Sequence, residues 1–100
     1  HGGDGMIVSM MRLRLDLEGM SSIKDKRRIV ASLKERLWRK FRMSVAAVDR
    51  QDSLSRAEIG AAIVSNSKTF GESVLQKALA FVEGESPGRV AEVEILSEQY

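Results

Sequence analysis

The sequence predicts an α+β domain in which strands and helices follow one another in the order β-α-β-β-α-β. Three observations lead to this expectation. Apolar and polar residues alternate with a period of two over Ile7–Glu18, which is typical of a half-buried strand. Apolar residues return every three or four positions over Ser21–Phe41 and again over 68–83, which indicates two amphipathic helices. Short stretches at 43–50, 56–65 and 89–96 have the composition of strands.

Composition limits the class of protein. The chain has 100 residues, of which 43% are hydrophobic and 30% charged, as expected for one globular domain. It contains no cysteine, which excludes disulfides, thiolate metal sites and a cysteine nucleophile. No apolar run approaches the ~20 residues of a membrane span, and no signal-peptide pattern is visible. A cytoplasmic protein that does not contact membranes is therefore expected.

The two ends of the chain are expected to lie outside the fold. The first five residues, HGGDG, have the composition of a tag remnant, with Met6 as the native start. The only histidine is His1, so this interpretation removes histidine catalysis and histidine metal ligation from the native chain. Residues 6–97 are expected to form one domain and residues 98–100 a frayed tail.

The helix predicted at Ser21–Phe41 organises the chain. Gly19 ends the strand before it, and the hydroxyl of Ser22 can accept a free amide of the first helical turn. Asp25 follows at the acidic position of a capping box. One broad face of this helix is apolar, as in a helix that packs on a core, and it consists of Ile23, Ile29, Val30, Leu33, Leu37 and Phe41.

The remaining elements follow from local signals. The strand at 43–50 is short and rich in small residues, and the polar segment 51–55 reads as a hairpin turn before the strand at 56–65. Ser67 can cap the second helix, and Gly84 is expected to stop it. Pro87 and Gly88 form a turn before the strand at 89–96, where apolar residues alternate with glutamates.

Two right-handed β-α-β crossovers place both helices on one face of a four-stranded antiparallel sheet. This is the ferredoxin-like arrangement, and its central strands would be 7–18 and 56–65. The other face of the sheet would then expose a smooth apolar surface, which consists of Val8, Met10, Gly60, Ala62 and Val64. A surface of this kind usually meets a partner.

Four stretches also resemble a known family. SIKDKRR at 22–28, SVAAVDRQD at 44–52, SRAEIGAAIVSNS at 55–67 and VLQKALAFVEG at 74–84 are similar to the YlxP-like family of small bacterial proteins, a domain of unknown function. The resemblance runs from Met6 to about Leu96. It departs at Leu54, where the family commonly carries a Trp. It implies a ferredoxin-like fold, a gene neighbourhood of translation and ribosome-maturation factors, and no established catalytic residue.

Charge is distributed unevenly. Residues 12–42 hold 11 Lys and Arg against 4 Asp and Glu, whereas residues 43–100 hold 5 against 9. Cations crowd the first two turns of the first helix, where the helix dipole favours anions, and cations with free amides suit a phosphate. We therefore expect contact with RNA or a ribosomal particle through Lys24, Lys26, Arg27, Arg28, Arg39 and Arg42. Arg12 and Arg14 could join them from the sheet. Lys26 falls inside the apolar stripe, so the alternative is that it only snorkels past the core edge while the other cations form a solvated face.

Other function classes have weaker support. No predicted strand carries Phe, Tyr or Trp, so bases are not expected to stack on the sheet. The smooth sheet face or an edge strand could instead pair with a second copy or bind a small ligand. Catalysis is not expected, because no serine has a native histidine partner and Asp49, Asp52 and Glu58 flank a solvated hairpin. No cofactor or metal is expected.

Overall fold

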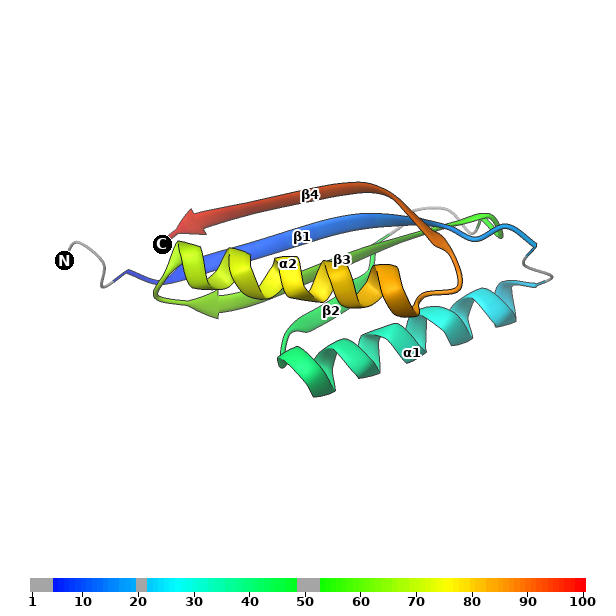
Figure 1. The fold of residues 1–100 in the computed structure, drawn as a ribbon, viewed down its shortest axis with the longest axis horizontal. Helices are drawn as coiled ribbons and strands as arrows, with labels where there is room; N and C mark the ends of the chain where they lie inside the picture. The colour runs from blue at the N-terminus through cyan, green and yellow to red at the C-terminus, as the bar shows by residue number, and fades with distance from the viewer. Residues whose placement is uncertain (1–4, 20–21, 49–52) are drawn as a thin grey trace.

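The computed structural model describes residues 5–19, 22–48 and 53–100. Within them, four strands and two helices follow the predicted order (Figure 1). The elements are β1 (Ile7–Asp16), α1 (Ile23–Phe41), β2 (Ser44–Ala47), β3 (Arg56–Ser65), α2 (Lys68–Glu85) and β4 (Arg89–Gln99). Both helices lie on one side of the sheet, and the predicted ferredoxin-like fold is confirmed.

The sheet has the strand order β2-β3-β1-β4, and every pairing is antiparallel. β1 and β3 are central, as predicted, and pair over ten residues from Ile7–Ser65 to Asp16–Arg56. Successive side chains of a strand point to opposite faces. One face of the sheet therefore meets the helices, and the other, which we call the open face, carries no helix (Figure 1).

The core lies between the sheet and the two helices. β1 contributes Met11, Leu13 and Leu15, and Leu17 follows them just beyond the strand. The other buried apolar residues are Val30, Leu33, Leu37, Met43, Ala57, Ile59, Ala61, Leu75, Ala78 and Val82. Each large side chain buried in this way contributes about 1.5–3 kcal/mol relative to exposure. Because α1 and α2 both contribute to this core, it fixes how each helix lies against the sheet.

α1 is capped at both ends. The hydroxyl of Ser22 accepts the backbone N–H of Asp25 at 3.1 Å, so the predicted N-cap is confirmed. At the other end Arg42 adopts the left-handed conformation (φ 54°), and its N–H donates to the carbonyl of Trp38 at 2.9 Å. An arginine at this position is unusual, because glycine or asparagine normally adopts it. Neither described helix is long and apolar enough to cross a membrane.

Several boundaries differ from the prediction. Gly84 does not stop α2, which continues to Glu85, because one glycine costs a helix only ~1 kcal/mol. β4 continues beyond residue 96 to Gln99, and the N–H of Tyr100 donates to the carbonyl of Met6 at 2.7 Å. This pairing with the start of β1 corrects the frayed tail expected at 98–100. The end of the predicted second strand, residues 51–52 of the predicted turn and residues 1–4 of the expected tag remnant lie outside the described residues.

Candidate nucleic-acid interface

The side of α1 that points away from the sheet carries most of the predicted site. Its exposed cations are Lys24, Arg27, Arg28, Lys34, Arg39 and Arg42, which we call the basic face of α1. Five of these six were predicted from sequence. Lys34 was missed, although it follows Arg27 by seven residues and so lies on the same side of the helix. The basic face also contains one exposed carboxylate, Glu35.

Lys26 does not belong to the basic face, which corrects the prediction. Its side chain is only 5% exposed, and its Nζ donates a hydrogen bond to the backbone carbonyl of Ser53 at 2.8 Å. The helical repeat places Lys26 in the same row as the buried residues Val30 and Leu33. This hydrogen bond from the Lys26 ammonium group therefore links α1 to the segment before β3.

The C-terminal end of the basic face is partly engaged. Arg39 Nη2 lies 2.7 Å from Glu35 Oε1, an exposed pair one helical turn apart. Such pairs contribute only about 0.3–0.5 kcal/mol, so a polyanion can compete for this arginine. Over residues 5–19, 22–48 and 53–100, by contrast, Lys24, Arg28 and Lys34 form no ion pair. The positive charges of these three side chains are therefore not neutralised by ion pairs within the described residues.

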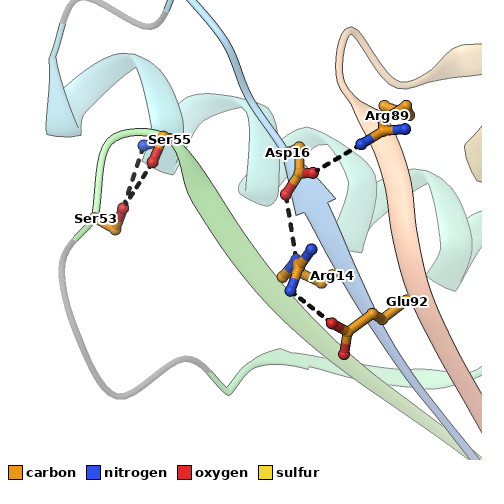
Figure 2. A network of polar contacts seen from close by, with 6 residues as sticks. All are labelled: Arg14, Asp16, Ser53, Ser55, Arg89 and Glu92. Carbon is orange, nitrogen blue, oxygen red and sulfur yellow. Dashed lines mark hydrogen bonds and ion pairs between the residues drawn. The ribbon is translucent and has the colours of Figure 1, made fainter.

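Arg12 and Arg14 do not extend this face, because both point from β1 to the open face of the sheet, away from α1. Arg14 contacts Glu92 Oε1 at 2.7 Å and Asp16 Oδ1 at 3.2 Å, and Arg89 reaches the same Asp16 (Figure 2). Arg12 Nη2 lies 3.4 Å from Glu58 Oε2. This end of the open face is a network of paired charges rather than a basic patch.

The other end of the open face is apolar, as predicted. Val64 is 66% exposed, and β4 adds the exposed Leu96, which was not among the residues expected on this surface. A groove of about 470 Å³ runs across this surface. Its lining includes Met10, Ser44, Ala46, Val48, Gly60, Ala62 and Leu96, together with the charged residues Arg12 and Glu94. We call this surface the apolar end of the open face.

The residues considered for acid-base or metal chemistry are not brought together. Asp49 and Asp52 lie outside the described residues, and Glu58 pairs with Arg12. Among the residues that the structure describes, no three His, Cys, Asp or Glu side chains gather in a way that could hold a metal ion.

Ser9 is fully buried, and its hydroxyl contacts the hydroxyl of Ser97 at 2.8 Å. The Ser97 hydroxyl in turn donates a hydrogen bond to Glu72. This last network ties β1, β4 and α2 together.

Comparison with known proteins gives a family and a fold. The family described as "Protein of unknown function (DUF503)" matches residues 8–95. The "Uncharacterized protein YlxP" of Bacillus subtilis (strain 168) is 36% identical over 62 residues, which are 62% of this chain and 67% of that protein. The de novo designed protein Foldit4 superposes with a TM-score of 0.56 at 18% identity, over 95% of this chain and 98% of the design. A dimeric protein of unknown function and ferredoxin-like fold from Bacteroides fragilis NCTC 9343 superposes with a TM-score of 0.51 at 10% identity, over 94% and 96% of the two chains.

Proposed function

The chain belongs to the DUF503 family, whose function is unknown, and we propose that this member is a non-catalytic domain that contacts RNA, free or within a ribosomal particle, through the basic face of α1. One observation carries the proposal. Arg12, Arg14 and Arg89 on the open face are paired with carboxylates, whereas six exposed cations share the outer side of α1 with one carboxylate. In the folded domain, the excess of positive charge in residues 12–42 therefore lies mainly on the basic face of α1.

The dimensions of this surface suit a phosphate backbone. From Lys24 to Arg42 the helix extends about 27 Å at 1.5 Å per residue, which is long enough to follow several successive phosphates. Cations that neutralise phosphates release condensed counterions, so affinity falls steeply as salt rises. Such contacts position a protein on RNA without reading its sequence. Recognition of shape or of a particular RNA strand must come from other side chains.

Sedimentation with purified small ribosomal subunits, at low and then moderate salt, tests the proposal. The wild-type protein should sediment with the subunits at low salt and be released as salt rises. The double variant Lys24→Glu/Arg28→Glu should stay in the supernatant. Lys68→Glu/Lys77→Glu is the matched control, since it makes the same change of charge at exposed positions of α2. If wild type does not sediment at low salt, contact with the small ribosomal subunit is excluded, and if the two double variants behave alike, the basic face of α1 is not the site.

The proposal also predicts that the domain does not catalyse a reaction. Domains of this size can hydrolyse acyl phosphates when a glycine-rich loop follows the first strand, but the segment here is Gly19-Met20-Ser21-Ser22. A steady-state assay with an acyl phosphate should therefore give the rate of the buffer alone. Substantial turnover would contradict a purely binding role.

The exposure of Val64 and Leu96 favours a second candidate, in which two copies associate through the apolar end of the open face. The ferredoxin-like neighbour from Bacteroides fragilis, itself a dimer, shows that this fold can accommodate a dimer. The groove of about 470 Å³ also falls within the size range of small-molecule sites. Light scattering at micromolar concentration tests for self-association. A dimer that Val64→Glu converts to a monomer would support self-association, and a wild-type monomer would exclude it.

A further inference from the structure

Trp38 lies in the middle of the basic face and is the only tryptophan of the chain. Its side chain remains 53% exposed, although it is the largest apolar residue of α1. Lys34 precedes it by four residues and Arg42 follows it by four, so the three side chains form one row along the helix. An indole exposed between two cations is not explained by packing of the core.

The C-terminal cap of α1 holds one of these cations against the indole. Arg42 adopts a left-handed conformation, and its backbone N–H is bonded to the Trp38 carbonyl. The centre of its guanidinium group lies 5.5 Å from the centre of the Trp38 ring, which is a cation–π distance. The unusual arginine at this cap thus keeps positive charge beside the aromatic surface.

A hollow of about 470 Å³ adjoins the indole, between α1 and the edge strand β2. Its lining is formed by Ala31, Lys34, Glu35, Trp38, Met43, Ser44 and Val45. Ala31 and Ser44 have small side chains, which leaves room beside the ring. Because β2 ends the sheet, the hollow opens at its edge. The volume falls within the range of small-ligand sites.

We infer that this hollow takes an unpaired nucleobase stacked on Trp38, while Lys34 and Arg42 contact the phosphates on either side of it. The inference rests on the proposed RNA contact and adds that the RNA is single-stranded where it contacts Trp38. In a duplex the bases are already stacked and cannot reach the indole. The carboxylate of Glu35 in the lining would repel a phosphate, which favours a base inside the hollow and the phosphates at its rim. Stacking tolerates any base, so strong sequence preference is not required.

Because Trp38 is the only tryptophan, selectively excited indole fluorescence reports on this site alone. The probes are a short oligoadenylate, a sugar-phosphate oligonucleotide of the same length without bases, and an RNA duplex. Oligoadenylate should quench the fluorescence and bind more tightly than either of the other two. Trp38→Leu lacks the fluorophore, so filter binding measures its affinity for oligoadenylate, which should be roughly 5- to 150-fold weaker than that of wild type, the range measured for loss of one stacked base. Phe70→Leu, at a 59% exposed aromatic of α2, is the matched control and should bind as wild type does.

The outcomes separate this inference from the proposed function. Suppose that Lys24→Glu/Arg28→Glu abolishes binding, that Trp38→Leu binds oligoadenylate as tightly as wild type does, and that wild type binds the baseless oligonucleotide as tightly as oligoadenylate. The RNA contact is then supported and the stacking site is wrong. Duplex binding as tight as oligoadenylate binding also overturns it. If wild type binds none of the probes at low salt, both proposals fail. Circular dichroism spectra that coincide for wild type and Trp38→Leu establish that the variant is folded.

Discussion

The ammonium group of Lys26 donates a hydrogen bond to the main-chain carbonyl of Ser53 at 2.8 Å, beneath the first turn of α1. This contact joins the start of α1 to the segment that leads into β3. It also divides the cations of α1 into two groups. Lys26 is directed inward and maintains the structure, whereas Lys24 and Arg28 are directed outward. The two groups should respond differently to mutation.

Lys26→Met should reduce the free energy of unfolding by about 1–3 kcal/mol, because the Ser53 carbonyl loses its donor while the side-chain stem is kept. RNA affinity at temperatures where the variant is folded should stay close to that of wild type. Lys24→Met is the matched control and should show the opposite pattern, with unchanged stability and weaker RNA binding. Urea unfolding and a filter-binding titration measure the two quantities. Equal stability losses in both variants would contradict the division of roles.

Gly71→Ala should destabilise the domain by about 1–3 kcal/mol, the usual cost of overpacking. At Gly71, α2 passes so close to β1 that a Cβ would overlap Ser9 Oγ and lie 2.9 Å from Ser9 Cβ. Ser9 is fully buried and cannot move aside. Gly84→Ala is the control in the same helix, since nothing lies within 4 Å of its added Cβ. That change should stabilise by about 0.5–1 kcal/mol, so thermal unfolding should shift in opposite directions for the two variants.

Arg14→Met should cost roughly 1 kcal/mol of stability, because the exposed Glu92 loses its partner and the half-buried Asp16 keeps only Arg89. Arg12→Met, at a more exposed pair, should stay within about 0.5 kcal/mol of wild type. Neither change should alter salt-dependent RNA binding, because both residues lie on the opposite side of the sheet from α1. A loss of RNA affinity in either variant would place the interface on the open face instead.

Tyr100 is the only tyrosine, so absorbance of its phenolate can be followed alone. The hydrogen bond from its hydroxyl to Glu98, together with the charge of that carboxylate, raises the pKa of Tyr100 above its ordinary value. Glu98→Ala should lower the pKa back towards about 10, whereas Glu94→Ala should not. Since the folded pKa is the higher one, the stabilising contribution is present below the unfolded pKa and is lost as pH rises through the folded pKa. An unchanged titration in Glu98→Ala would exclude this hydrogen bond.

Local patterns in the sequence were sufficient for most of the fold. Period-two alternation predicted β3 at Arg56–Ser65 without error and β1 to within two residues. The apolar stripe and the Ser22 cap predicted α1, and charge along that helix predicted five of the six exposed cations of its basic face. These are properties of single elements. Periodicity specifies which residues share a face, and right-handed crossovers then leave few arrangements of four strands and two helices.

The candidate site depended on contacts between elements that are distant in sequence. Lys26 lies in the apolar stripe, but only the segment at Ser53 determines that its ammonium group is buried and bonded. The sequence suggests that Arg12 and Arg14 are available to bind a polyanion, but in the structure they pair with Glu58 of β3 and Glu92 of β4. Trp38 became a candidate ligand contact because β2 forms a hollow beside it. Periodicity assigns a side chain to a face of its own helix or strand, whereas its partner is decided by which distant segment the folded chain places there.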